Sequence, residues 1–440
     1  MRSWMTGAAL GALVGFATIS AGSLAWSANN NAASTSTFSE VELFADVLVR
    51  VQSEYVTEID RREAIDAAIN GMLGSLDPHS SYLSADKFRS MQIDTSGEYG
   101  GLGIEVTMED GFVKVIAPID DTPAARAGIE SGDLIVAING QPIVGQSLDE
   151  AVKEMRGEIG SDITISILRP GQEETFDVTL TRELIQPRTV VSRVEEGNIG
   201  YVRISNFNER TTDLLEDALD KIRSEAGGRP EGLVIDLRNN PGGLLDQAVS
   251  VSDLFLTGGE IVSTRGRRDS DIQRYNARSG EEFRGVPIIV LINGGSASAA
   301  EIVAGAIQDR GRGRVLGITS FGKGSVQTVI PLGGDRGALR LTTARYYTPS
   351  GRSIQSTGIE PDIEISNRRY SEEEIEKLKF FSEAALPNAL SNEAGTERRL
   401  PHVPDEQPPE DYEGEDYQLD RALDILRGQA QVSDRDVDAG

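Results

Sequence analysis

Cysteine is absent from this chain of 440 residues, and histidine occurs only twice, as His79 and His402. Without thiols the chain has no disulfide, no thiol nucleophile and no cysteine-ligated zinc. The scarcity of histidine removes most histidine-based metal sites and leaves two candidates for the base of a Ser-His-Asp triad. His79 lies in the turn-forming sequence Asp77-Pro78-His79-Ser80, where we expect it to interact with local backbone only. We expect neither a metal nor another cofactor.

Basic residues are scarce as well. Lys and Arg number 43 against 70 Asp and Glu, which gives a formal net charge of −27. Phosphate backbones attract patches of Lys and Arg and repel a surface with this balance of charge. The chain is therefore not expected to bind nucleic acid.

Long apolar runs are limited to the start of the chain. After Arg2, apolar and small residues extend from Trp4 to Trp26, and Ala25-Trp26-Ser27 resembles a small-x-small cleavage site. This pattern predicts a secretory signal peptide or a retained membrane anchor over residues 1–27, followed by a polar linker over 28–37. We expect an exported, periplasmic protein, held at the inner membrane if the segment is retained.

Residues 38–96 are predicted to form a helical N-terminal region. Apolar residues recur at helical spacing from Val41 to Val51, and a second helix is predicted over residues 61–76. Each helix has one apolar face, which must pack on the rest of the protein or on a second copy. We expect a homo-oligomer, a dimer or higher.

The C-terminal region, residues 371–440, is acidic. Its stretch from Pro404 to Tyr417 is also rich in proline, and this composition is typical of disorder. We predict a partly disordered tail, with one further helix over residues 417–427.

Residues 97–185 contain β-type runs around two short helical segments, one from Asp121 to Ile129 and one from Leu148 to Met155. This order of elements resembles a PDZ domain of the bacterial protease type. The resemblance implies that a glycine-rich loop receives the terminal carboxylate of a peptide, which then adds to the next strand. The alternative is a glycine-rich turn without a ligand. The loop residues are Gly101, Leu102, Gly103 and Ile104.

Residues 186–370 show an α/β pattern. A buried strand at 232–237 leads through the turn 238–243 into a helix, and a second apolar strand at 287–292 leads through the turn 293–297 into another. Repeated units of this kind predict a largely parallel sheet covered by helices. Because ligands gather at the carboxyl ends of such strands, we expect the two glycine-rich turns to meet there.

Ser298 lies at the predicted start of the second helix, which suits a nucleophile that attacks a carbonyl. The N–H groups of Ala299 and of Gly242 or Gly243 are candidates for an oxyanion hole. In the absence of a suitable histidine, Lys323 in its Gly-Lys-Gly loop is the best-placed base, because burial in an apolar cleft lowers the pKa of an amine. We expect Gln327 to lie on the same strand face and to orient that amine.

Other interpretations of the same residues are weaker. Ser296 is a second candidate nucleophile, although a serine there is more typical of a helix cap. Ser320 to Lys323 matches S-x-x-K, but that motif requires a helix. Gly317 to Lys323 matches G-x-x-x-x-G-K, yet a glycine and a strand follow where a Ser/Thr and a helix are required.

The segments around these residues resemble the carboxyl-terminal processing (tail-specific) protease family. The resemblance rests on residues 236–244, 293–306, 322–327, 344–352 and 358–361, and it extends from the helical N-terminus to about residue 366. It implies an α/β core of the ClpP/crotonase type with an inserted PDZ domain. It also implies a serine endopeptidase with a Ser-Lys dyad assisted by Gln, and the family spacing selects Ser298, Lys323 and Gln327.

We therefore expect an exported endopeptidase whose PDZ domain captures apolar C-termini of protein substrates. Which of the two glycines serves the oxyanion hole stays open. The alternative from another class is a PDZ-type scaffolding protein with an inactive protease core. A third hypothesis is that the helical termini keep the enzyme inactive until an adaptor protein binds.

Overall fold

The computed structural model describes residues 39–428, except for 110, 173, 279, 379–380, 397 and 399–401. The predicted signal or anchor segment and the linker lie outside the described residues. Within the described part, no helix is both long enough and apolar enough to cross a membrane. The chain divides into two units at Met72.

The two predicted N-terminal helices are present. Residues 39–54 form the first, and α2 (Arg61–Gly74) is the second. The first helix exposes large apolar side chains, namely Val41, Leu43, Phe44, Val47, Val49 and Val51.

The region expected to be helical also contains a strand. After α2, β1 (Ser81–Leu83) pairs antiparallel with β18 (Ala338–Tyr347), and α3 (Ala85–Ser96) follows. Ser84 caps α3, and Gly97 ends it in the left-handed conformation with φ 72°.

The next domain has the PDZ-like order predicted from the sequence. Its sheet has the order β3-β4-β5-β7-β8, with β6 paired to β5, and the strands β2 and β9 pair where the chain enters and leaves. A capping box formed by Ser147 and Glu150 starts α5. The bounds are β2 (Tyr99–Gly101), β3 (Ile104–Glu109), β4 (Phe112–Pro118), α4 (Pro123–Arg126), β5 (Leu134–Ile138), β6 (Gln141–Pro142), α5 (Leu148–Met155), β7 (Asp162–Leu168), β8 (Phe176–Thr181) and β9 (Glu183–Ile185).

The following region is built on a six-stranded sheet of order β10-β11-β12-β15-β16-β19. β10 and β11 are antiparallel and the other neighbours are parallel, which confirms the predicted largely parallel sheet. The bounds are β10 (Val190–Glu195), β11 (Ile199–Ile204), β12 (Gly232–Asp236), β15 (Ile288–Ile292), β16 (Arg314–Gly317) and β19 (Ile363–Glu364).

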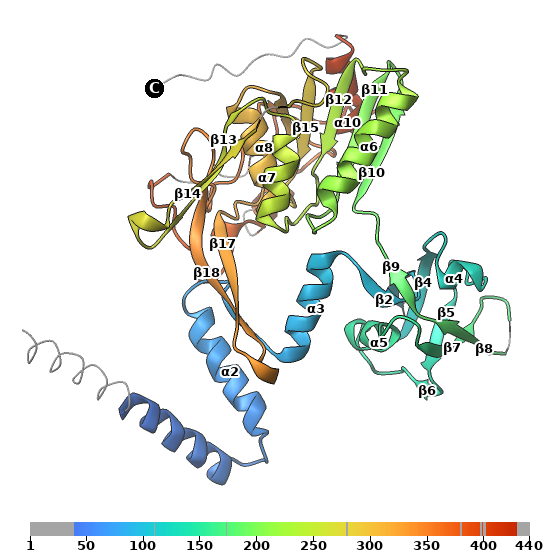
Figure 1. Cartoon of the computed structure of the whole chain (residues 1–440), viewed down its shortest axis with the longest axis vertical. Coiled ribbons are helices and arrows are strands. Elements are labelled where there is room, and N and C mark those ends of the chain that lie inside the picture. Colours follow the sequence, from blue (N-terminus) through green and yellow to red (C-terminus); the bar gives the residue numbers. More distant parts are fainter. Residues whose placement is uncertain are drawn as a thin grey trace, which may run out of the picture. The chain divides into compact units, whose positions relative to one another are not determined.

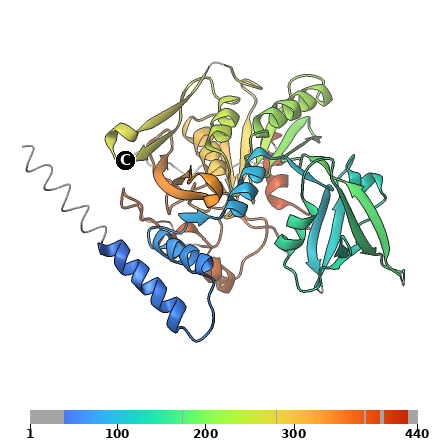
Figure 2. The ribbon, with the colours of Figure 1, turned by 60° about the horizontal axis from the view of Figure 1, so that its bottom comes forward.

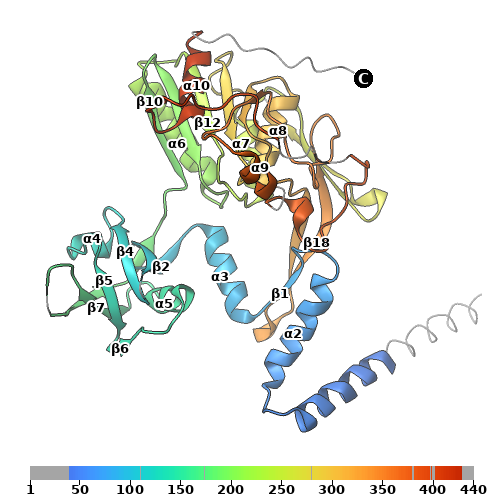
Figure 3. The ribbon, with the colours of Figure 1, turned by 180° about the vertical axis from the view of Figure 1, so that it is seen from behind.

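Helices cover both faces of this sheet (Figures 1 and 3). α6 (Thr211–Glu225), α7 (Leu245–Asp253) and α8 (Ala299–Asp309) pack on one face, and α10 (Tyr417–Leu426) packs on the other. Residues alternate between the faces: Ile235 joins the cluster under α6 to α8, whereas Val234 joins that of α10. Burial on both sides explains why these strands are continuously apolar.

A second sheet has the order β1-β18-β13-β14, and β17 pairs with β18. β17 (Ser325–Pro331) and β18 form a long hairpin, drawn in orange in Figure 2. The remaining elements are β13 (Gly259–Gly266), β14 (Gln273–Ala277), α9 (Glu372–Leu378) and the 3₁₀ helices η1 (Asp269–Asp271), η2 (Gly334–Arg336) and η3 (Glu383–Ala385).

Part of the acidic C-terminal region packs on the core. The predicted helix over 417–427 is present as α10, but residues 404–417 make defined contacts where disorder was predicted. Arginines compensate the acidic side chains: Arg238 donates to Asp416 at 2.7 Å, and Arg421 donates to Glu406 at 2.5 Å. Composition alone does not reveal these partners, and Arg238 lies 178 residues away from Asp416 in the sequence.

Candidate active site

Two glycine-rich turns meet at the carboxyl ends of β12 and β15, as predicted. The main-chain N–H of Asn239 donates to Asn293 Oδ1 at 2.9 Å, and Asn293 Nδ2 donates back to Asn239 Oδ1 at 2.9 Å. The N–H of Ala297 also donates to the carbonyl of Asn240 at 2.9 Å. These three hydrogen bonds hold the two turns together.

Ser298 occupies the residue just before α8, with φ 54° and ψ −113°. A positive φ is strained for a residue that has a Cβ, and such strain is typical of functional turns. The side chain is buried and lies near the phenol of Tyr346. Burial raises the pKa of Tyr346 to about 12, so this phenol stays protonated.

Ser296, the alternative nucleophile, has a structural role. Its hydroxyl donates to the carbonyl of Leu237 at 2.8 Å and accepts the N–H of Asn293 at 3.0 Å. The expected helix cap is therefore wrong for this residue, because α8 begins three residues later and its N-cap is Ser298.

Glu301 is completely buried and binds the segments that contain Ser298 and Lys323. Its Oε2 accepts the main-chain N–H of Ser298 at 2.7 Å and that of Lys323 at 2.9 Å. Its Oε1 accepts the N–H of Gly322 at 2.7 Å and the hydroxyl of Ser320 at 2.5 Å. Burial raises the pKa of Glu301 to about 7, although the four hydrogen bonds act against this rise. One carboxylate thus holds residues 298 and 323 beside each other.

The environment of Lys323 favours the neutral form of its amine. Burial lowers the pKa of its amine, and the charge of Arg340 lowers it further. The carboxylates of Glu383, Glu301 and Asp77 act in the opposite direction. Across the described part of the chain, the amine has no hydrogen-bond partner, and it does not bond to the Ser298 hydroxyl.

Within the described residues, Gln327 forms no hydrogen bond with Lys323 either. Its Nε2 donates to Ser325 Oγ at 3.0 Å and to Thr342 Oγ1 at 3.3 Å. The expected shared strand face is wrong, because β17 begins at Ser325, after Lys323, and its register shifts between Val326 and Gln327.

The structure distinguishes the two glycines proposed for an oxyanion hole. The N–H of Gly242 already donates to Asn240 Oδ1 at 2.8 Å. The N–H groups of Gly243 and Ala299 form no hydrogen bond with any described residue. A Cβ on Gly242, whose φ is 101°, would lie 2.8 Å from the Cβ of Ser298, so only glycine permits this close approach.

The predicted peptide-binding loop lines a cavity of about 170 Å³ in the PDZ-like domain, with all four residues from Gly101 to Ile104 in its wall. Val152 and Met155 of α5 provide apolar surface opposite. The N–H groups of Leu102 and Gly103 have no acceptor among the residues that the structure describes. This geometry can accept a carboxylate beside an apolar side chain.

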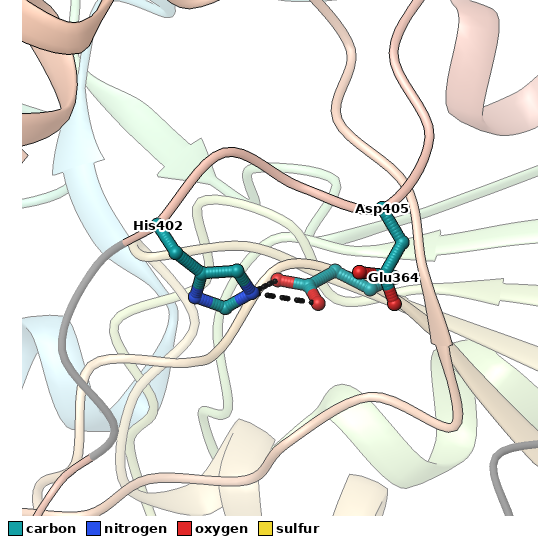
Figure 4. A group of neighbouring side chains, drawn as sticks. All are labelled: Glu364, His402 and Asp405. Carbon is teal, nitrogen blue, oxygen red and sulfur yellow. Dashed lines mark hydrogen bonds and ion pairs between the residues drawn. The ribbon is translucent and has the colours of Figure 1, made fainter.

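A separate cluster of ionisable side chains lies at β19 (Figure 4). His402 Nε2 lies 2.8 Å from one carboxylate oxygen of Glu364, and Asp405 is close by. The N–H of Glu406 also donates to the carbonyl of Glu364 at 3.2 Å. The main-chain pairing and the His–Glu ion pair explain this cluster as an attachment of the C-terminal segment to the sheet edge.

Sequence reasoning missed Glu301 and Tyr346. Ser298-Ala299-Ala300-Glu301 has the S-x-x-E spacing of a capping box, and this signal would have pointed to an interaction between the acid and the start of the helix. Tyr346 lies in a segment that carried the family resemblance, but no local pattern relates it to Ser298.

Several regions of the chain match known protein families. Residues 198–365 match the model of peptidase family S41, residues 100–180 match a PDZ domain, and residues 9–87 match the N-terminal domain of the activating protease CtpB. The carboxy-terminal-processing protease of Bartonella bacilliformis is 55% identical over 330 residues, which cover 75% of this chain and 76% of that protein.

The chain is also similar to more distant proteins. The carboxy-terminal processing protease CtpB of Bacillus subtilis is 36% identical over 324 residues, covering 73% of this chain and 66% of that protein. A solved structure of the photosystem II D1 C-terminal processing protease is 32% identical, with a TM-score of 0.43, and the match covers 71% of this chain and 85% of that one.

Proposed function

Since this chain belongs to peptidase family S41, as a serine protease of the carboxy-terminal processing type, we propose that Ser298, Lys323 and Gln327 carry out its reaction. The observation that supports this most strongly is the buried carboxylate of Glu301, which binds the main-chain N–H groups of both Ser298 and Lys323. One carboxylate therefore keeps the main chains of the proposed nucleophile and the proposed base close together.

In the proposed reaction, Ser298 Oγ attacks the carbonyl carbon of the scissile bond while the neutral amine of Lys323 accepts the hydroxyl proton. The N–H groups of Gly243 and Ala299 stabilise the negative charge that develops on the carbonyl oxygen. The ammonium of Lys323 then protonates the leaving amine. Water, deprotonated by Lys323, hydrolyses the resulting ester.

The arrangement described here precedes that reaction. The Ser298 hydroxyl lies near the Tyr346 phenol, and the Lys323 amine is held by no hydrogen bond within the described residues. Productive geometry requires the serine hydroxyl and the lysine amine to form a hydrogen bond. Such a step suits a protease whose activity depends on substrate or adaptor binding.

The PDZ domain is proposed to bind the apolar C-terminus of a protein substrate. Its unbonded N–H groups at Leu102 and Gly103 suit the terminal carboxylate, and the wall formed by Val152 and Met155 suits an apolar last side chain. The bound peptide then extends along β3.

The setting of the enzyme is proposed from the sequence. The segment 1–27 supports export to the periplasm, with retention at the inner membrane if it is not cleaved. The apolar residues exposed on the helix 39–54 support a homo-oligomer. The substrates are then exported proteins that are processed or degraded there.

Ser298→Ala tests the proposal. Because Glu301 binds the main-chain N–H of residue 298, the substitution leaves the turn intact. We expect the full-length variant to keep its unfolding temperature and to lose at least about a thousand-fold in cleavage of a fluorescence-quenched peptide with an apolar C-terminus. Ser270→Ala, at an exposed serine, is the control and should match the parent. Cleavage by Ser298→Ala at the parent rate would refute the assignment.

The scaffolding alternative predicts a different result. A PDZ protein with an inactive core would bind the peptide without cleaving it, and it would not react with a fluorophosphonate. Cleavage by the parent chain together with labelling by this probe excludes that alternative.

A further inference from the structure

The Asp77–Ser80 turn, which follows α2, forms hydrogen bonds well beyond its own backbone. The carboxylate of Asp77 is buried and accepts the N–H of His79 at 2.9 Å and the N–H and hydroxyl of Ser80 at 2.9 and 2.6 Å. These three bonds shape the turn. The fourth bond leaves it, since Thr342 Oγ1 of β18 donates to Asp77 Oδ1 at 3.0 Å.

This fourth bond sets the orientation of Gln327. Burial raises the pKa of Asp77, but its hydrogen bonds outweigh burial and keep the pKa below the usual range, so the group is ionised and can only accept. Thr342 must therefore donate its single hydroxyl proton to Asp77. Its oxygen is left to accept the Nε2–H of Gln327, at 3.3 Å.

These bonds also determine where the amide oxygen of Gln327 points. Gln327 Nε2 donates to both Ser325 Oγ and Thr342 Oγ1, so both of its N–H groups are used. Its Oε1 points away from these hydroxyls and is the end that can accept an N–H of Lys323. A reversed Thr342 hydroxyl would favour the opposite amide orientation.

A second path runs from His79 to the loop of Lys323. His79 Nε2 lies 2.8 Å from Glu383 Oε2, and the other oxygen of Glu383 accepts Gln355 Nε2 at 3.0 Å. Gln355 Oε1 accepts the N–H of Gly324 at 3.1 Å, and the N–H of Glu383 donates to the carbonyl of Phe321 at 3.1 Å. Lys323 lies between these two anchored positions.

Charged groups in and around the Asp77–Ser80 turn also affect the pKa of the Lys323 amine. Asp77 and Glu383 act with Glu301 to raise the pKa of Lys323, whereas burial and Arg340 lower it. Arg340 is itself fixed by the turn, because its Nε donates to the carbonyl of His79 at 3.1 Å. Removal of one carboxylate therefore lowers the pKa of the base.

We propose that the Asp77–Ser80 turn is a positioning element for the catalytic base: Asp77, through Thr342, orients the Gln327 amide, and His79, through Glu383 and Gln355, holds the Lys323 loop. The proposal rests on the assignment of Ser298, Lys323 and Gln327. It replaces the expectation that His79 interacts with local backbone only.

The first test is Asp77→Asn in the full-length chain, assayed on the same quenched peptide. We expect kcat to fall about ten- to a hundred-fold, with a smaller change in KM. Because the variant loses a negative charge near Lys323, the acid limb of its pH–rate profile should move to lower pH by about half a pH unit or more. A turn with a merely structural role would lower the rate without moving this limb.

Thr342 provides a test that does not depend on the folding of the Asp77 variant. Thr342→Val keeps the shape of the side chain but has no hydroxyl, and we expect it to lower kcat about ten-fold or more. Thr342→Ser keeps the hydroxyl and should restore most of the rate. Equal kcat for the two Thr342 variants would overturn the first path.

The two histidines form a matched pair for the second path. Each faces a buried glutamate, at 2.8 Å for His79–Glu383 and at 2.8 Å for His402–Glu364, but only the first pair reaches the Lys323 loop. We expect His79→Gln to lower kcat at least about five-fold and His402→Gln to leave kcat unchanged. Parent-like kcat for His79→Gln would overturn this path.

The Ser298→Ala variant distinguishes failure of the proposed function from failure of the positioning role. If it cleaves the peptide, the proposed function fails, and this inference fails with it. If Ser298→Ala is inactive while the Asp77, Thr342 and His79 variants retain the parent kcat and pH profile, only the positioning role is wrong.

Discussion

The amine of Lys323 is the group whose protonation state limits the proposed reaction. A general base works only when neutral, and burial lowers the pKa of this amine from 10.5. Activity should therefore increase with pH through a limb that lies below the ordinary lysine range. The limb is measured as kcat/KM of the parent chain against pH.

A substitution connects that limb with Lys323. Lys323→Arg keeps a cation that does not deprotonate, and we expect it to lose at least about a thousand-fold in kcat. Lys221→Arg, on an exposed face of α6, is the control. Parent-like activity of Lys323→Arg, or an acid limb at the pKa of an ordinary lysine, would contradict the role of this residue.

Glu301 permits a second prediction at the scale of one residue. All four of its partners are donors, so Glu301→Gln places an N–H group against an N–H or O–H group in a fully buried site. We expect a loss of about 2–4 kcal/mol in the free energy of unfolding, measured with urea, together with loss of cleavage. Glu282→Gln, at a partly exposed ion pair, should lose less than about 1 kcal/mol. Equal losses for the two variants would show that Glu301 is not the link described here.

The residues that bear the chemistry were predictable to different degrees. Ser298 and Lys323 have local signals, namely a serine at a strand–turn–helix junction and a lysine between glycines. Glu301 had only a weak local signal. The bonds of Asp77 to Thr342 and of His79 to Glu383 had none, because they join residues hundreds of positions apart.

Among the elements, the two strand–turn–helix units were predictable because buried parallel strands are continuously apolar. The meeting of their turns followed from the rule for parallel sheets and is confirmed by the bonds between Asn239 and Asn293. The relation of Lys323 to Gln327 was not predictable, since the start of β17 and its bulge decide which way Gln327 points. The packing of α10 and its ion pairs depends on Arg238, which no local pattern connects with Asp416.

The loop between β2 and β3 gives a prediction at this scale. Gly103 has φ 76°, and a Cβ there would lie 2.3 Å from the Cβ of Thr122. Gly103→Ala should therefore distort the loop and weaken binding of a fluorescent peptide with an apolar C-terminus about ten-fold or more, measured by anisotropy.

Two controls accompany this measurement. Gly145 has φ 89° with open space around its Cβ position, so Gly145→Ala has similar backbone strain but should bind nearly as the parent does. An amidated peptide should bind weakly to all three proteins. Equal binding of the free and amidated peptides would contradict carboxylate recognition by this loop.

At the scale of the whole molecule, the proposed oligomer depends on the helix formed by residues 39–54. Phe44 and Val47 are exposed on the helix 39–54, and contiguous apolar surface of this kind is typical of an interface. We expect the parent to sediment as a dimer or larger species, and Phe44→Asp with Val47→Asp to shift it toward the monomer. Ser53→Asp adds a charge to the same helix and should not change the sedimentation. A monomeric parent would refute the oligomer.

The most direct test of the central claim is the site of covalent labelling. The parent chain is treated with a fluorophosphonate, digested and mapped by mass spectrometry. We predict a single adduct on Ser298, its absence in Ser298→Ala, and much slower labelling in Lys323→Ala, because the probe reports a hydroxyl activated by that amine. An adduct on Ser296 or on another residue would contradict the role of Ser298. Full peptide cleavage by a chain whose Ser298 is completely labelled would contradict it as well.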